Sequence, residues 1–394
     1  MSAPRTGRVH EFALDLRPVR APEIAANELA YVVLRAGGRV VGRMVLDGAR
    51  SVPAGGFVSA ARAAAEEGLA ALRAEADSGT SAAIPAAADV TVVIATRNRV
   101  EGLRAALASL RALHPPPGQI VVSDSASDDA GAVARAAREA GADLVRCERP
   151  GLSHARNEGA AAARGEILAF LDDDCRVDTG WLEGILRGFT DPRVSIVTGA
   201  FLPAELSTTA QRLFLSYSHM DRRGFVPRRF TRDRAESPHW PLDAWRMGSG
   251  GNLAVRAESF RTRGGFRTDL GLGTPALGGE DLYFLWATVL EGGDVVYRPD
   301  AMAWHGHHRE LPALRRVMFG YGVGHRAFLD AAVRAGAPQG RASLYAASFW
   351  YDRLRRLAGA LVRLEPARAG LVLREMSGML AGSRRARRAR REAR

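Results

Sequence analysis

The sequence is poor in cysteine and has neither lysine nor a long apolar run. Cys147 and Cys175 are the only cysteines among 394 residues, which excludes a disulfide framework and favours a reducing compartment. No apolar stretch reaches the roughly 18–20 residues that span a bilayer. Residues 1–16 lack the apolar segment of a secretory signal. We therefore expect a cytoplasmic protein.

The positive charge is concentrated at the C-terminal end. The net charge is +12, and residues 383–394 hold seven arginines and one glutamate, which is half of that excess. Such a run is typical of a solvated tail; the alternative is an anchor for anionic lipid or nucleic acid. The chain has arginine but no lysine, and it is rich in alanine and glycine. We attribute this preference for arginine to coding bias rather than to function.

Two glycine-rich phosphate loops are also missing. The sequence has no GxxxxGK[ST] motif, and no GxGxxG opens a helix after the first strand of the central region. A phosphate group would therefore be held in another way, and a metal ion that bridges a diphosphate would serve.

The chain divides into five regions. Two apolar runs around Gly37–Gly38 predict a β-hairpin, and an alanine-rich helix is expected over residues 57–76. A small, polar stretch then resembles a linker. The expected regions are a small N-terminal α+β region (1–76), a linker (77–89), an α/β domain (90–310), amphipathic C-terminal helices (311–383) and an Arg-rich tail (384–394).

Strand and helix patterns alternate through the α/β domain, which predicts a parallel sheet covered by helices on both faces. The expected strands are 90–96, 119–124, 142–147 and 166–172, and the expected helices are 101–113, 129–141, 153–165 and 179–189. Ligands in open α/β sheets bind beyond the carboxyl ends of the strands. Polar residues occur there, at 96–98, 124–125 and 172–174.

Three consecutive carboxylates follow the strand over residues 166–172. If the strand continued, Asp172 and Asp174 would point to one side and Asp173 to the other. Two carboxylates aimed at one point repel unless a cation lies between them, and Mg²⁺ or Mn²⁺ fits oxygen ligands of this kind. The alternatives are an acidic surface turn or an N-cap for the helix that starts near residue 179.

Five motifs together resemble the family-2 glycosyltransferases. They are VTVVIATRNR, IVVSDSASDD, RPGLSHARNEGAAAARGEILAFLDDDCRV, GSGGNLAVRAESF and GGEDLYFLWATVLEGG, in the order and spacing of that family, over about residues 90–310. The resemblance implies a GT-A fold, in which a nucleotide-binding parallel or mixed sheet is flanked by helices. It also implies transfer of a sugar from a nucleotide-diphospho-sugar.

The resemblance implies the residues that bind the donor. Thr96 and Arg97 would line the nucleotide pocket, and Asp124 would hydrogen-bond the base, usually uracil. Arg156 would lie near the nucleotide and its phosphates. Asn252 would belong to a glycine-rich turn near the donor sugar.

The resemblance also implies the metal site and the base. Asp172 and Asp174 match the D-x-D pair of the family, with His305 as a third ligand of Mg²⁺ or Mn²⁺. Asp281 matches the general base that takes a proton from the acceptor hydroxyl, with Glu280 beside it. Without the resemblance, these two acids would be interpreted as first-turn residues that favour the helix dipole.

Several nearby residues leave alternatives open. His307 and His308 would bind phosphate or be simply exposed, and Cys175 is interpreted as a packing residue. The irregular segment 219–246 is either a loop on the acceptor side or an ordinary connection. The C-terminal helices would pack on the catalytic domain, or lie with the Arg-rich tail on an anionic membrane surface.

The sequence therefore predicts an inverting, metal-dependent glycosyltransferase. Its partners would be a nucleotide-sugar donor, such as a UDP-sugar, and a glycan, lipid-linked or small-molecule acceptor. No nucleic acid is expected, because three acids at the focus of the site would repel it. The rival hypothesis is a non-catalytic nucleotide-sugar, membrane or nucleic-acid binding protein that uses the basic tail. A third, a sugar nucleotidyltransferase, would ordinarily have a basic glycine-rich loop where this chain has TRNR.

Overall fold

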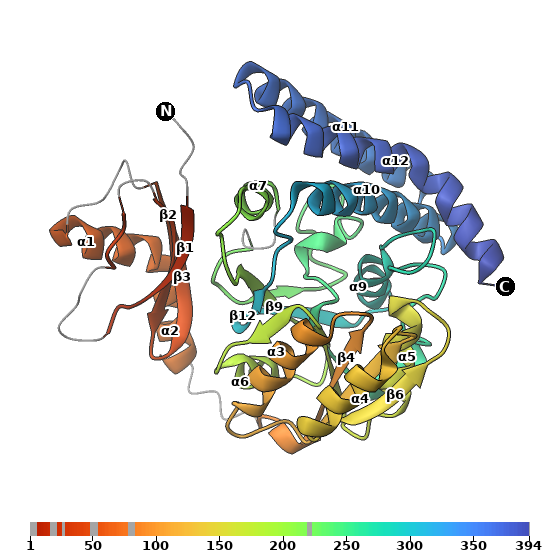
Figure 1. The fold of residues 1–394 in the computed structure, drawn as a ribbon, viewed down its shortest axis with the longest axis horizontal. Coiled ribbons are helices and arrows are strands. Elements are labelled where there is room, and N and C mark those ends of the chain that lie inside the picture. Colours follow the sequence, from red (N-terminus) through yellow and green to blue (C-terminus); the bar gives the residue numbers. More distant parts are fainter. Residues whose placement is uncertain are drawn as a thin grey trace.

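The computed structural model describes residues 6–15, 22–25, 28–47, 54–77, 83–218 and 223–393. A small sheet with two helices forms the N-terminal part, and a large mixed sheet with helices on both faces forms the centre. Three long helices at the C-terminal end lie across one side of the large sheet (Figure 1). The fold is thus the mixed α/β class that the sequence predicts.

The N-terminal part is a three-stranded sheet covered by two helices. The hairpin is confirmed: β2 and β3 pair antiparallel, and Gly37 and Gly38 at the turn have positive φ angles that suit glycine. The first strand, which pairs in parallel with β2, was not predicted. The helix expected over 57–76 is two helices. The elements are β1 (Thr6–Ala13), β2 (Glu28–Ala36), β3 (Arg39–Asp47), α1 (Ala54–Ala64) and α2 (Glu66–Asp77).

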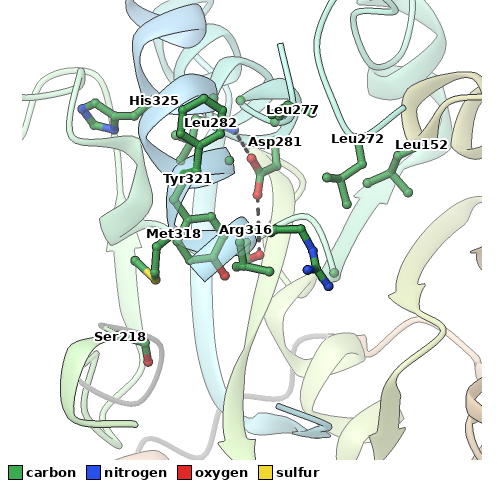
Figure 2. Close-up of a pocket in the computed structure, with 18 of the residues that line it drawn as sticks. Leu152, Ser218, Leu272, Leu277, Asp281, Leu282, Arg316, Met318, Tyr321 and His325 are labelled. Carbon is green, nitrogen blue, oxygen red and sulfur yellow. Dashed lines mark hydrogen bonds between the residues drawn. The ribbon is translucent and has the colours of Figure 1, made fainter. Parts of the chain in front are cut away.

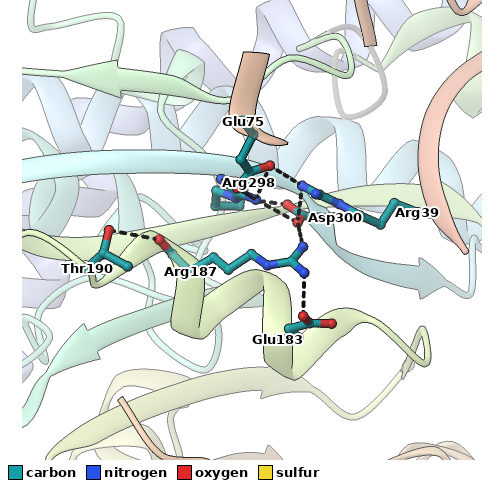
Figure 3. Close-up of polar contacts among 7 residues, drawn as sticks. All are labelled: Arg39, Glu75, Glu183, Arg187, Thr190, Arg298 and Asp300. Atoms are coloured by element: carbon teal, nitrogen blue, oxygen red, sulfur yellow. Dashed lines mark hydrogen bonds and ion pairs between the residues drawn. The ribbon is translucent and has the colours of Figure 1, made fainter. Parts of the chain in front are cut away.

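A buried ionic network joins this part to the large sheet (Figure 3). Arg39 of β3 donates to Asp300 of the large sheet at 2.8 Å and to Glu75 of α2 at 2.7 Å. Arg298 donates to the same two carboxylates, and Arg187 reaches Asp300 at 3.4 Å. Asp300 is only 5% exposed, so three guanidinium groups share one buried carboxylate.

The large sheet is mixed. Its order is β10-β12-β9-β11-β7-β4-β5-β6, with β8 paired to β12. The four predicted strands are confirmed, and β6, β5, β4 and β7 are parallel neighbours. The antiparallel strand β11 inserts between β7 and β9. The strands are β4 (Val90–Thr96), β5 (Gln119–Ser125), β6 (Asp143–Cys147), β7 (Ile167–Asp172), β8 (Cys175–Val177), β9 (Val194–Pro203), β10 (Arg228–Phe230), β11 (Asn252–Arg256) and β12 (Asp294–His305).

Two hydrophobic cores lie on the two faces of this sheet. Along β7, Ala169 and Leu171 pack with α3, α4 and α6, whereas Leu168 and Phe170 pack with α8 and α9. This alternation follows from the two-residue period of a strand, and it explains why β7 is apolar on both faces. The helices are α3 (Val100–Arg111), α4 (Ala130–Glu139), α5 (Leu152–Ala161), α6 (Trp181–Gly188), α7 (Thr209–Tyr217), α8 (Ala257–Thr262) and α9 (Glu280–Leu290).

The C-terminal region forms three helices, α10 (Leu311–Arg334), α11 (Gln339–Val362) and α12 (Pro366–Glu392). Glycines let α10 and α12 approach closely: a Cβ at Gly322 would lie 2.0 Å from the Glu375 carbonyl oxygen, and one at Gly378 would lie 2.1 Å from that of Phe319. No helix in the described ranges is both long and apolar enough to cross a membrane.

The Arg-rich segment differs from the expected solvated tail, because it forms the last turns of α12. Ala386 and Ala389 are buried in a cluster with Leu270, Ala327 and Ala331. The alanines between the arginines therefore form a packing face of the helix. The high charge of the segment gave no indication of this face in the sequence.

We expect Asp300→Asn to lower the free energy of unfolding by about 3–5 kcal/mol, because it leaves the buried Arg298 and the half-buried Arg39 and Arg187 without their shared carboxylate. Urea unfolding at pH 7 measures this change. The control is Glu183→Gln: the Glu183 side chain is 62% exposed beside Arg187, and its loss should cost less than about 1 kcal/mol. Equal effects of the two substitutions would contradict a structural role for the network.

The effect of Asp300→Asn should also depend on pH. Burial opposes ionisation of Asp300, but Arg298 and Arg39 outweigh it and lower the pKa of this carboxyl. Its contribution to stability is therefore complete above the ordinary aspartate pKa of about 3.9 and is lost as the pH falls below that value.

Candidate active site

A cavity of about 1430 Å³ opens beyond the carboxyl ends of β4 and β7. Its walls come from these strand ends, the turn before β11, the start of α9 and the end of β12 on one side, and from α7, α10, α11 and α12 on the other. Figure 2 shows part of this wall, with Asp281 of α9 and Arg316, Tyr321 and His325 of α10.

A glycine turn brings the backbone close to the charged groups of the cavity. A Cβ at Gly250 would lie 2.8 Å from the Asp281 Cβ and 2.9 Å from an Arg156 nitrogen, and one at Gly251 would lie 2.1 Å from an Asp172 oxygen. Side chains at these positions would displace the charged groups, so the GSGG sequence is a steric requirement of the site.

Arg156 of α5 connects two carboxylates. It donates from Nη2 to Asp172 Oδ1 at 2.8 Å and from Nη1 to Glu280 Oε1 at 3.1 Å, and its guanidinium packs over the Phe266 ring. Burial opposes its charge, but the carboxylates outweigh burial and raise the Arg156 pKa. Asp172 is therefore neutralised by a buried arginine.

Asp173 turns away from Asp172 toward β4. It accepts a hydrogen bond from Thr96 Oγ1 at 2.8 Å and forms an ion pair with Arg99, which also reaches Asp174 at 2.8 Å. The expected strand alternation does not extend past Asp172, because the strand ends there and residues 173–174 form a turn. Burial raises the pKa of Asp173 to about 6, against the opposing effect of Arg99.

Asp174 and His305 form the best candidate for a cation site. Asp174 Oδ1 lies 3.5 Å from His305 Nε2, and His305 Nδ1 lies 2.8 Å from His307 Nδ1, which fixes the orientation of the ring. Burial opposes ionisation of Asp174, but His305 and Arg99 outweigh it and hold its pKa below the usual range. One carboxylate and one imidazole fit Mg²⁺ or Mn²⁺, which keep positions for water and phosphate oxygens.

Two neighbours fit that cation less well. The ligand atoms of Asp174, Cys175 and His305 lie within 4.8 Å of one another, but burial raises the pKa of the Cys175 thiol far above its usual value. A protonated thiol is a poor ligand for a hard ion. Asp172, the other predicted ligand, is paired with Arg156 instead of facing His305.

Asp281 and Glu280 occupy different environments at the start of α9. Asp281 lines the cavity and accepts hydrogen bonds from the backbone N–H groups of Gly250 at 3.0 Å and Leu282 at 2.8 Å. Figure 2 shows the bond from Leu282. Glu280 is 5% exposed, and burial, together with Asp281, raises its pKa to about 7 despite Arg156. Asp281 is thus positioned to meet a ligand, whereas Glu280 positions Arg156.

Two predicted donor residues, Asp124 and Asn252, do not line the cavity. Asp124, at the end of β5, is held by Arg146 and by the backbone N–H of Ser127. Asn252 is 1% exposed and uses its amide inside the sheet, where it donates to two carbonyl groups and accepts from Trp181. Neither is among the lining residues, so the structure gives Asn252 a structural position rather than one at the donor.

The remaining predicted residues do line the cavity. Thr96 is buried and Arg97 is exposed at the end of β4. Sequence reasoning missed Arg99, although it lies just beyond the same strand end. It also missed Arg223 and the cavity-facing arginines of α10 to α12, because no motif marks residues on long helices. Residues 219–222 of the irregular segment lie outside the described part, and Arg223 and Trp245 of its remainder line the cavity.

Comparisons with known proteins agree with this geometry. Residues 91–263 match the family model described as glycosyl transferase family 2. The pre-mycofactocin glycosyltransferase of Mycobacterium tuberculosis is 30% identical over 236 residues, which is 58% of this chain and 44% of that protein. Polypeptide N-acetylgalactosaminyltransferase 12 of Mus musculus is 30% identical over 186 residues, which is 44% of this chain and 30% of that protein. The matched stretch thus covers less than half the length of these relatives.

A solved structure has a similar fold. The mannosyltransferase PcManGT from Pyrobaculum calidifontis, in complex with GDP-Man and Mn²⁺, superposes with a TM-score of 0.51 over 80% of this chain and 94% of that chain, at 20% identity. The family match and the fold agree on the central part of the chain: residues 91–263 match the family 2 glycosyltransferases, and the superposition shows a fold shared with the mannosyltransferase.

Proposed function

We propose that the chain transfers a sugar from a nucleoside-diphospho-sugar to an acceptor hydroxyl, with inversion at the anomeric carbon. The observation that carries this proposal is that Asp281 and the Asp174–His305 pair line one cavity, at the strand ends of the stretch that matches family 2. The acceptor oxygen would bond to the anomeric carbon as the bond to the diphosphate oxygen breaks. The hydroxyl proton would pass to Asp281.

The surroundings of Asp281 suit a general base. Backbone N–H groups of Gly250 and Leu282 fix the carboxylate, and no arginine pairs with it in the described residues. Its neighbour Glu280 is tied to Arg156 and buried, so Glu280 would act on the donor side through Arg156. Arg156 would in turn hold the Asp172 carboxylate beside the glycine turn.

The charge of the donor side supports a divalent cation. Asp174 and His305 would hold it, and it would neutralise the departing diphosphate. Arg99 and Arg156 are already paired with aspartates, which leaves few cations for phosphate. Arg97, which has no carboxylate partner among the described residues, would contact the nucleotide. We propose a UDP-sugar as the donor on the family resemblance, although Asp124 would need to leave Arg146 to bind uracil.

The outer face of α11 supports a peripheral contact with anionic lipid. Leu344, Tyr351, Leu354 and Leu361 are 55–71% exposed and lie on one side of the helix by their spacing. Exposed arginines flank this apolar stripe on α11 and continue on the last turns of α12. Apolar side chains bordered by arginines favour the interface of an anionic bilayer.

We expect Asp281→Asn to lower transfer by about 10²–10⁴-fold, because it removes the proton acceptor. Donor binding, measured by calorimetry, should remain, since Asp281 contacts the acceptor. The control is Glu183→Gln, which lies outside the cavity. Near-normal turnover by a folded Asp281→Asn protein would rule out Asp281 as the general base. If the wild-type chain itself showed no turnover, the rival hypothesis of a non-catalytic binding protein would be favoured.

Metal removal should abolish transfer, and Asp174→Asn or His305→Gln should weaken Mn²⁺ binding by about 10-fold or more, because each removes one ligand. Binding is measured directly by electron paramagnetic resonance of Mn²⁺, without and with UDP or GDP. Cys175→Ser should leave Mn²⁺ affinity unchanged. Full activity of chelator-treated protein would refute the cation site.

Vesicle flotation tests the lipid contact. The wild-type chain should float with phosphatidylglycerol vesicles and not with neutral phosphatidylcholine vesicles, and Tyr351→Asp with Leu354→Asp should abolish flotation. Leu144→Asp, on β6, is the control, because Leu144 is an exposed apolar residue of another surface. Absence of flotation, or a dimer in solution that the double substitution dissociates, would contradict the contact.

A further inference from the structure

Charge is unevenly distributed along the cavity wall. On the strand side, four arginines face five carboxylates. The side formed by α10, α11 and α12 carries only two carboxylates, Asp352 and Glu375. Its six arginines are Arg315, Arg316, Arg353, Arg356, Arg374 and Arg385. The helical side of the cavity is therefore strongly positive.

Two of these arginines, Arg353 and Arg356, form ion pairs with the two carboxylates of the helical side. Glu375 is 5% exposed and accepts from Arg353 at 2.6 and 2.9 Å and from the Tyr217 hydroxyl. Asp352 accepts from Arg356 at 2.7 Å and also pairs with Arg353. This network links α7, α11 and α12, and it is electrically balanced without any ligand.

The other four arginines have no carboxylate partner within the described ranges. Arg315 and Arg316 lie in the first turns of α10, and Arg374 and Arg385 lie on α12. Arg385 packs over the Phe319 ring, 5.2 Å from its centroid. The close packing of α10 and α12 at their glycines holds these like charges on one cavity wall. Arg315, Arg316 and Arg374 are exposed, so solvent screens part of their repulsion, and together they give this wall a positive potential that favours an anion.

A buried polar atom on the same wall is also without a partner. His325 Nε2 of α10 is buried and makes no hydrogen bond, while its ring stacks on Phe349 at 5.0 Å. Tyr345 lies beside it, with a ring distance of 5.2 Å. The helical side thus combines aromatic surfaces with unused hydrogen-bonding groups, which is the composition of a site for a partly apolar, partly ionised ligand.

We propose that the helical side of the cavity is the acceptor subsite and that it selects an acceptor bearing a phosphate or carboxylate group. The inference rests on the proposed function, since it requires the donor on the strand side. Arg315, Arg316 and Arg374 would bind the acid through charge-assisted hydrogen bonds. The aromatic residues would contact the body of the acceptor, and its hydroxyl would face Asp281.

Inorganic phosphate is the first probe, titrated calorimetrically into full-length protein already saturated with Mn²⁺ and UDP. We expect one phosphate to bind the wild-type chain. The double variant Arg315→Gln with Arg374→Gln should weaken phosphate binding by about 10-fold or more, because each lost bond is to a charged group. Arg384→Gln is the matched control, since Arg384 lies on α12 and does not line the cavity.

Transfer assays provide the second readout. Hexose 6-phosphates and hexuronic acids should be better acceptors than the matching neutral hexoses, and the double variant should raise the acceptor KM with no change in UDP affinity. A short isoprenyl phosphate, run in parallel, distinguishes a lipid source of the phosphate from a soluble one. Equal use of neutral and acidic acceptors, or phosphate binding that the double variant does not weaken, would overturn the proposal.

The same experiments separate this inference from the function on which it rests. If the wild-type chain binds neither UDP nor a nucleotide-sugar in the presence of Mn²⁺, the proposed function fails. If it binds and hydrolyses the donor but shows no preference for acids, the acceptor inference alone fails.

Discussion

The structure depends on the neutralisation of carboxylates that the fold gathers at one edge of a sheet. The end of β7 and the turn after it bring Asp172, Asp173 and Asp174 to the same cavity that receives Glu280 and Asp281 from α9. Such a group is unstable without countercharge, because each buried carboxylate loses hydration. Buried Arg156 pairs with Asp172 and Glu280, and the partly exposed Arg99 pairs with Asp173 and Asp174. Asp174 also lies 3.5 Å from His305, where we propose that a cation binds.

Close backbone packing at glycines also limits the positions of these charged side chains. A Cβ at Gly250 or Gly251 would lie 2.1–2.9 Å from atoms of Arg156, Asp172 or Asp281, so a side chain at either position would displace these charged groups. Glycines at the interface of α10 and α12 bring these two helices together on the opposite wall, which carries arginines without a carboxylate partner in the described ranges. Close backbone packing thus shapes both walls of the cavity, and the two walls differ in charge.

Most of the central fold could be predicted from the sequence, because β-branched runs such as residues 90–96 alternate with amphipathic helices. The antiparallel insertion of β11 and the packing of α12 through Ala386 and Ala389 could not, since both depend on contacts between distant segments. The strand β1 was missed because its mixed sequence, TGRVHEFA, has little apolar alternation.

The roles assigned to the site residues stay predictions, and the structure adds which side chains contact them. The motifs located Asp174, Asp281 and His305 on one cavity, but they did not reveal that Arg146 holds Asp124 or that Asn252 is enclosed by the sheet. Such pairings depend on side chains of other helices and strands that contact the motif in the folded protein. The motif itself does not specify those side chains.

Anomalous diffraction from crystals of the chain grown with Mn²⁺ and a non-hydrolysable UDP-sugar would locate the cation and the donor together. We expect a manganese peak bonded to Asp174 and His305 and to oxygens of the diphosphate, with the anomeric carbon facing Asp281. An ordered diphosphate in the cavity with no manganese at Asp174, or a donor bound elsewhere, would contradict this expectation.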